Sequence, residues 1–98
     1  MITIIAKSVI LDGMKERFKE LISELITESR KENGCISYNL FEDMNNKNIL
    51  TIIEEWEDEK SIENHNKSDH FNRIRPLLSK FREGSPQVEL FKLIDDIE

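Results

Sequence analysis

Both histidines and the single tryptophan of this chain lie close together in the sequence. Trp56 comes first, and His65 and His70 follow it before the next apolar stretch begins at Phe71. An imidazole has an unperturbed pKa of about 6.5, so a histidine that faces a cavity can take a proton from a bound substrate at neutral pH. Residues 56–71 are therefore the first candidate for a functional site, with His65 and His70 as its candidate catalytic groups.

Helical spacing predicts where each histidine points. Ile62 and His65 are three residues apart, so on a helix they share a face, and His65 should point toward the sheet if Ile62 does. His70 precedes Ile74 by four residues, which places it on an apolar stripe and predicts that it lines the same cavity from the other side. The alternative for each is a partly buried histidine near a helix end that bonds a backbone carbonyl or water.

The histidine spacing does not predict a metal site. His65 and His70 are five residues apart across a predicted helix break at Ser68, unlike the i, i+4 spacing of helical metal ligands. No cysteine or carboxylate stands at a matching spacing, so we expect no metal. Ser8 has no readable histidine and acid partners, and the three glycines do not form a nucleotide-binding loop.

Three further side chains could line a site or belong to the core. Trp56 shares strand parity with Glu54, so both point to one face of a predicted strand. A tryptophan there packs as core or walls an aromatic pocket, and Tyr38 has the same two interpretations. Burying an unpaired Glu54 costs free energy, so it either meets a lysine or arginine from a helix or is part of the site.

The elements that must position these residues follow a simple order. Apolar and β-branched runs predict strands over 2–10, 35–42, 49–56 and 88–94, and apolar steps of three and four predict a helix over 14–32. Asp58 and Ser68 are suited to cap a short second helix and a third helix that reaches Phe81. The order β-α-β-β-α-β predicts an α+β, ferredoxin-like fold, with helices over one face of an antiparallel sheet.

Local signals also predict how the helices begin and end. Asp12 is the expected cap of the first helix, and Asn33 and Gly34 are its expected stop. Pro76 lacks a backbone N–H, so it predicts a kink in the third helix or its division into two pieces.

The strands carry apolar residues at both parities. The strand over 49–56 places Leu50 and Ile52 on one face and Ile49 and Ile53 on the other. One layer of helices covers only one face of a sheet, and a large exposed apolar patch marks an interface. We therefore expect two sheets to pack face to face in a homodimer; loops that bury the strand ends are the alternative.

Composition limits the class of protein. Ninety-eight residues predict one domain over 1–98, and the net charge of −6 argues against nucleic acid and anionic membranes as partners. No apolar run reaches the roughly 20 residues that a membrane helix needs. The single cysteine, Cys35, cannot form an internal disulfide, which favours a cytoplasmic location.

Three motifs together resemble the antibiotic biosynthesis monooxygenase family, of its quinol monooxygenase type. They are Glu32–Tyr38 with its glycine-cysteine pair, Glu54–Glu59 with its Glu-x-Trp, and His65–Phe71 with its His-x4-His-Phe. The resemblance covers nearly the whole chain and implies a dimeric α/β barrel with a pocket between sheet and helices. It also implies oxygenation of an electron-rich aromatic, such as a quinol or anthrone, with no cofactor. The heme-degrading branch uses an asparagine on the first strand, and residues 4–9 contain none, which argues against heme.

The resemblance also suggests roles for the candidate residues. His65 would be the base, Asn64 or His70 would hold the substrate anion, and Trp56 and Phe71 would wall the pocket, with Tyr38 and Glu54 as further substrate contacts. The expected partners are a second copy of the chain and a small aromatic substrate.

Two other functions fit the same fold. One is a dimeric binding or stress-response module without turnover, and the other is an isomerase of a small phosphorylated metabolite. Lys7, Arg73 and Arg75 are the candidate phosphate anchors, but they are not clustered. Consumption of O₂ would separate the monooxygenase from both alternatives.

Overall fold

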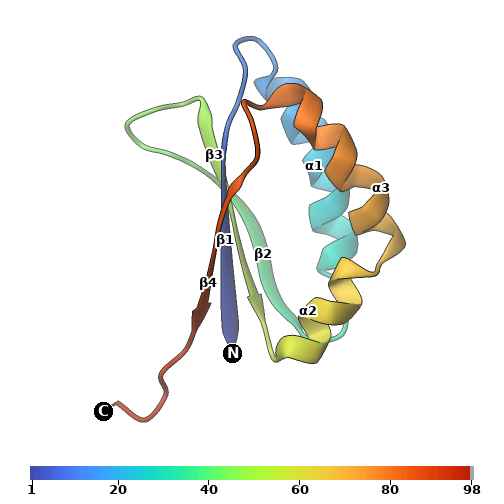
Figure 1. Cartoon of the computed structure of the whole chain (residues 1–98), viewed down its shortest axis with the longest axis vertical. Coiled ribbons are helices and arrows are strands. Elements are labelled where there is room, and N and C mark those ends of the chain that lie inside the picture. Colours follow the sequence, from blue (N-terminus) through green and yellow to red (C-terminus); the bar gives the residue numbers. More distant parts are fainter. Residues whose placement is uncertain (98) are drawn as a thin grey trace.

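The computed structural model describes residues 1–97 and has one antiparallel sheet with its helices on one side (Figure 1). The sheet has four strands in the order β2-β3-β1-β4. The elements are β1 (Ile2–Val9), α1 (Lys15–Ser29), β2 (Cys35–Glu42), β3 (Ile49–Trp56), α2 (Glu59–Asn66), α3 (Asp69–Leu78), the 3₁₀ helix η1 (Ser79–Phe81) and β4 (Gln87–Lys92). The predicted α+β, ferredoxin-like fold is confirmed, and the strand bounds agree to within two residues.

The first helix departs from its predicted ends. Its N-cap is Met14, which makes no side-chain cap, whereas the Asp12 carboxylate accepts a hydrogen bond from the Asn48 amide across the neighbouring turn. The predicted cap at Asp12 is therefore wrong. The helix ends at Ser29, so Glu32 lies in the following turn rather than in the helix.

Gly34 closes this turn with a φ of +84°. A side chain there would be strained, and a Cβ atom would lie 1.9 Å from the Ser61 Oγ of α2. The turn between α1 and β2 thus packs directly against α2. This close approach brings Glu32 within reach of the side chains of α2 and α3.

The caps of the two later helices are confirmed. The Asp58 carboxylate accepts from the Ser61 N–H at 2.8 Å, and the Ser68 hydroxyl accepts from the Phe71 N–H at 3.3 Å. Pro76 lies inside α3, which continues to Leu78 before changing to the 3₁₀ helix. The predicted division into two pieces is therefore found two residues after Pro76, because the proline falls in the last turn of α3 and few helical bonds remain beyond it.

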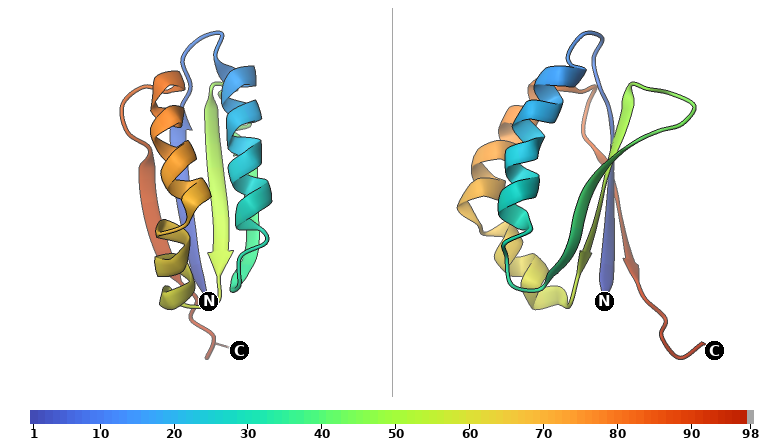
Figure 2. Two further views of the ribbon diagram at one scale, coloured as in Figure 1. Left: turned by 90° about the vertical axis from the view of Figure 1, so that its right-hand side faces the viewer. Right: turned by 180° about the vertical axis from the view of Figure 1, so that it is seen from behind.

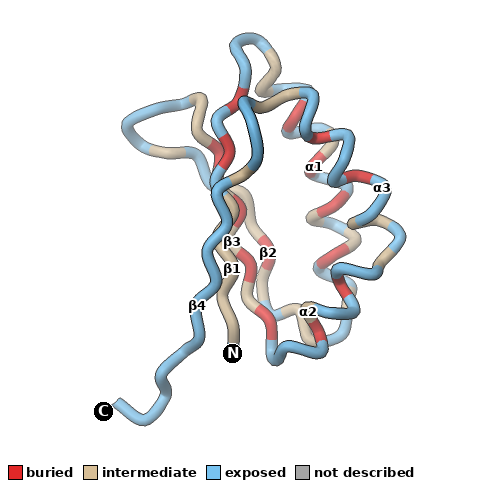
Figure 3. The backbone as a smooth tube through the Cα atoms, in the orientation of Figure 1, coloured by how far each residue is buried: buried red, intermediate tan, exposed pale blue. Residues whose placement is uncertain are grey.

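The core lies between the helices and the inner face of the sheet. Buried side chains recur along α1, α3 and β3, whereas β4 is exposed along its length (Figure 3). Each large apolar side chain buried here stabilises the fold by about 1.5–3 kcal/mol. The main contributors are Phe18, Ile22, Leu25, Leu50, Ile52, Trp56, Ile74 and Leu78.

Among residues 1–97, no helix covers the other face of the sheet (Figure 2). Ile5 and Ile53 are register partners at its centre, and their parity is opposite to that of the core residues. Phe41 and Phe91, on the flanking strands, are each 48% exposed. The second apolar face predicted from strand parity is therefore present in the described chain.

Within residues 1–97, none of the helices is long and apolar enough to span a membrane.

Candidate active site

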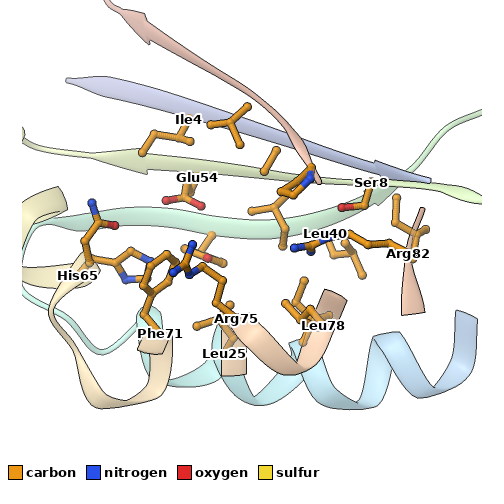
Figure 4. A pocket seen from close by; sticks show the side chains of 18 of the residues that line it. Ile4, Ser8, Leu25, Leu40, Glu54, His65, Phe71, Arg75, Leu78 and Arg82 are labelled. Atoms are coloured by element: carbon orange, nitrogen blue, oxygen red, sulfur yellow. The ribbon is translucent and has the colours of Figure 1, made fainter. Parts of the chain in front are cut away.

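A cavity lies between the inner face of the sheet and the helices (Figure 4). Its volume is about 470 Å³, which is within the range of small-molecule sites. Most of its wall is apolar, with side chains from the sheet and from all three α-helices. The polar side chains that line it are Ser8, Tyr38, Glu54, His65, Asn66, Arg75, Arg82 and Ser85.

His65 reaches this cavity from α2. Ile62 also lines the cavity, so the three-residue spacing correctly predicted the direction of His65. The imidazole is 1% exposed and packs against the rings of Trp56 and Phe71, each with its centroid 4.7 Å away. Its Nε2 atom is buried and has no hydrogen-bond partner among residues 1–97.

Glu32 holds the opposite side of the His65 ring. Its Oε2 atom lies 2.6 Å from His65 Nδ1 and 2.9 Å from His70 Nε2. A carboxylate oxygen accepts hydrogen bonds, so the neutral His65 ring carries its proton on Nδ1 and its lone pair on Nε2. This assigns the free lone pair to the Nε2 atom of a cavity-lining ring, as a general base requires.

Burial and two neighbouring side chains act on the pKa of His65. Burial lowers it, because a charged imidazolium loses hydration; the hydrogen bond and charge of Glu32 partly offset that effect, and the charge of His70 adds to the lowering. The net pKa is below the usual value for histidine. The ring is therefore mostly neutral at neutral pH and able to accept a proton.

His70 does not line the cavity. It lies in the first turn of α3, partly exposed, and contacts Glu32. The prediction that it lines the cavity from the other side is wrong, because the apolar stripe of α3 begins at Phe71 and His70 turns toward the loop after α1. Its contact with Glu32 helps to fix the carboxylate that orients His65.

Glu32, His65 and His70 are also the group that could hold a metal ion, since their ligand atoms lie within 4.8 Å of one another. No carboxylate stands at a matching local spacing in the sequence, but Glu32 reaches both histidines from 33 residues before His65. Two ligands of one tetrahedral metal stand about 3.4 Å apart when each bond is about 2.1 Å. The 2.6 and 2.9 Å separations fit shared protons better.

Glu54 is the second titratable group on the cavity wall. It is 6% exposed, and its Oε1 atom accepts a hydrogen bond of 2.9 Å from the Trp56 indole. Burial raises the pKa of Glu54 to about 7, although the side chains of Trp56 and Tyr38 partly counter the rise. The expected lysine or arginine partner is not found among residues 1–97, so Glu54 is held by an indole and faces the cavity.

Of the remaining candidate residues, some line the cavity and others do not. Tyr38 and Phe71 line the cavity, whereas Trp56 lies behind His65 and Glu54 and does not. Asn64 is exposed and does not line the cavity, whereas Asn66, two residues further along α2, does.

Two residues contribute to the site without a local sequence signal. Glu32 stands 33 residues before His65, so no local spacing connects them. Arg82 follows the third helix, and its position in the cavity depends on a bridge to Ile10 at the end of β1.

The sequence model of one protein family matches residues 1–77 of this chain. That model is described as antibiotic biosynthesis monooxygenase. The chain belongs to this family. The resemblance inferred from its three motifs is therefore confirmed.

Solved structures agree with the family assignment. An antibiotic biosynthesis monooxygenase structure superposes with a TM-score of 0.88 at 29% identity, covering 96% of this chain and 99% of that one. A conserved protein from Methanosarcina mazei Go1 superposes with a TM-score of 0.91 at 37% identity, covering 93% and 90%. The ferredoxin-like arrangement is thus shared with members of the antibiotic biosynthesis monooxygenase family.

Sequence relatives align over shorter parts. A Bacillus subtilis protein named "Putative monooxygenase YcnE" is 37% identical over 59 residues, which are 57% of this chain and 62% of that protein. An uncharacterized protein of Synechocystis is 26% identical and is covered over 55% of its length. The chain thus spans less than two thirds of either curated relative.

Proposed function

We propose that this family member is a cofactor-independent monooxygenase that oxidises a small, electron-rich aromatic, a quinol or anthrone, with O₂. The single observation that carries the proposal is that His65 lines a cavity of about 470 Å³ and that its buried Nε2 atom has no hydrogen-bond partner within the described chain. The Glu32 contact at the other ring nitrogen supports it.

The first step is removal of a proton from the substrate. His65 Nε2 takes it from a hydroxyl group, or from the acidic ring carbon of an anthrone. Glu32 then stabilises the imidazolium through the Nδ1–H bond. The apolar wall excludes water, which strengthens these charge interactions.

The substrate itself supplies all the electrons. The anion gives one electron to O₂, and the resulting radical pair combines to form a carbon–oxygen bond, which yields a peroxide anion. The proton held by His65 returns to this anion, and the hydroperoxide loses water. A quinol becomes a hydroxyquinone and an anthrone becomes a quinone, with one oxygen atom in the product and one in water, so no external reductant is consumed.

The other cavity residues have separate roles in this proposal. Glu54, with a pKa near 7, can accept or donate a hydrogen bond to a second substrate hydroxyl. Tyr38 and Phe71 form the aromatic wall. Trp56 positions Glu54 through its indole N–H, and His70 positions Glu32. Asn64 has no role, because it lies outside the cavity.

We also propose that the uncovered sheet face is a homodimer interface. Its apolar residues include Ile5 and Ile53 at the centre and the exposed Phe41 and Phe91 at the sides. The same face of a second copy is the partner that fits it best, because the two apolar strips then pack against each other across a two-fold axis.

Oxygen uptake tests the proposed reaction. The purified protein would be screened with hydroquinones and anthrones under oxygen-18, with heme titration alongside. We expect uptake of one O₂ per substrate and one labelled oxygen atom per product. Ligand binding without uptake would support a binding module, product formation without uptake would support an isomerase, and a strong Soret shift would support heme binding.

A further inference from the structure

The cavity has a positively charged region that the proposed oxidation does not use. Arg75 of α3 and Arg82, which follows η1, both line it, and their side chains reach into the space between sheet and helices (Figure 4). Ser8 and Ser85 line the same cavity and add hydroxyl groups. In the figure, His65 and Arg82 come from opposite ends of the cavity, with Arg75 between them.

Arg82 has an unsatisfied donor. Its Nε atom is buried and lacks a hydrogen-bond partner within residues 1–97. None of the ion pairs of the described residues includes Arg82 or Arg75. The chain has 20 acidic residues, so the missing partner does not reflect a shortage of carboxylates.

Leaving the buried Arg82 donor unpaired is costly, whereas Arg75 is exposed and its guanidinium lies over the Phe71 ring, 5.4 Å from the centroid. Burial lowers the pKa of Arg82, and the charge of Arg75 lowers it further, because the two cations repel each other. A buried donor without a partner costs free energy, and an oxyanion that accepts from it would recover that cost.

The neighbouring Arg73 shows the usual alternative. It lies on the same helix, pairs with Glu24 and lies near Asp69. Arg73 does not line the cavity. Of the two exposed arginines of α3, the chain therefore pairs Arg73 with its own carboxylates and leaves Arg75, like Arg82, without a carboxylate partner among the described residues.

We propose that Arg75 and Arg82 form an anion subsite, so that the preferred substrate is a hydroxyaromatic compound bearing a carboxylate or phosphate group. This identification of the substrate class rests on the proposed function for the reaction itself. The hydroxyl-bearing ring would lie against His65 and Phe71. Its anionic substituent would point toward Arg82, with Arg75 contacting both parts.

Binding under air-free conditions tests the subsite without turnover. Calorimetry would compare 1,4-dihydroxynaphthalene with 1,4-dihydroxy-2-naphthoate, and 1-naphthol with 1-naphthyl phosphate. We expect at least one anionic ligand to bind about 10- to 100-fold more tightly than its neutral counterpart, with an advantage that shrinks in high salt. The two pairs separate carboxylate from phosphate as the preferred group. Equal affinities within both pairs would overturn the proposal without any variant.

Three variants locate the effect. Arg75→Gln and Arg82→Gln should each remove most of the anionic advantage, and Arg82→Lys should keep part of it. Arg73→Gln is the matched control, because it removes the same charge from α3 outside the cavity. An advantage that survives in Arg82→Gln, or that disappears in Arg73→Gln, would overturn the assignment.

Admitting air after the titration tests the anion subsite and the proposed reaction with O₂ separately. Arginine-dependent binding without O₂ uptake supports the subsite while contradicting the monooxygenase. Equal uptake rates for neutral and anionic quinols, unchanged in Arg82→Gln, support the monooxygenase and overturn the subsite.

Discussion

The His65 ring lies between two opposing influences, an apolar cavity and the Glu32 carboxylate. Burial alone would make it a poor proton acceptor, since the imidazolium would lose its hydration. The 2.6 Å contact with Glu32 restores part of that stability and fixes which nitrogen is free. The direction of the base is thus set by a residue of the loop after α1, which also partly offsets the effect of burial on its pKa.

Oxygen uptake should follow the protonation of His65. Its pKa is lowered, so the neutral base is already populated below about pH 6.5. The rate should rise with pH through this lowered pKa and then level off. In Glu32→Gln the influence that raises the pKa is lost, so the inflection should move lower and the rate should fall. The kcat/KM profile from pH 4.5 to 9 measures both.

The exposed Glu20→Gln is the control for this profile and should leave the inflection in place. An inflection that moves upward in Glu32→Gln, or does not move, would show that Glu32 does not tune His65.

Glu54 should make stability depend on pH. Its pKa is raised to about 7, so between about pH 4.5 and 7 the folded protein holds a proton that the unfolded chain releases. Glu54 therefore stabilises the folded state at low pH, and this contribution is lost as the pH rises. Relative to Glu54→Gln, the wild type should lose about 2–4 kcal/mol between pH 4.5 and 8. Urea unfolding at both pH values measures this difference.

Glu55→Gln, on the opposite face of β3, is the matched control and should show little of this change. A difference between wild type and Glu54→Gln that is the same at both pH values would mean that Glu54 stays charged in the fold.

Part of this residue-scale picture could be predicted from the sequence. Ile62 identified the inward direction of His65, because a helix repeats locally. Glu32 could not be found in that way, since its contact depends on how the loop after α1 folds against α2. The sequence did not distinguish Asn64 from Asn66 as the cavity residue, because one apolar residue does not determine which side of a two-turn helix faces inward.

At the scale of elements, the turn from α1 to β2 determines whether the site forms. Gly34 lets the backbone pass beside Ser61 of α2, and Glu32 lies two residues before it. The sequence identified Gly34 as a stop signal but placed the helix end at Glu32. Gly34 with its positive φ lies in the turn that follows the helix, so it marks a position several residues after the last helical residue, Ser29.

Gly34→Ala should therefore damage both stability and the site. It adds strain at a φ of +84° and a clash with Ser61. Gly13→Ala is the matched control, because its φ is +79° and nothing lies within 4 Å of the added Cβ. Gly34→Ala should lose about 1–3 kcal/mol more stability in urea unfolding. Equal losses in the two variants would show that α2 moves away freely.

At the scale of the whole molecule, the sheet separates two tasks. Its inner face carries the cavity, and its outer face carries an apolar strip that no element of residues 1–97 covers (Figure 2). The sequence predicted this division, because strand parity is a local property. The pocket between sheet and helices was implied by the family resemblance and not by strand parity, because its size depends on how far α1 and α3 stand from the sheet.

Light scattering after size-exclusion chromatography checks the outer face. We expect the wild type at micromolar concentration to have twice its chain mass of 11.6 kDa. Ile53→Lys places a charge at the centre of the strip and should give a monomer. Ser23→Lys, on the exposed side of α1, should remain a dimer. A monomeric wild type would contradict the proposed interface.

The central claim is that His65 is the base of a reaction with O₂. The most direct measurement is substrate-dependent oxygen uptake by wild type and His65→Ala, with folding checked by circular dichroism. The account predicts a fall of about 100-fold or more in kcat for His65→Ala. A His65→Ala protein that consumes O₂ at the wild-type rate would contradict it.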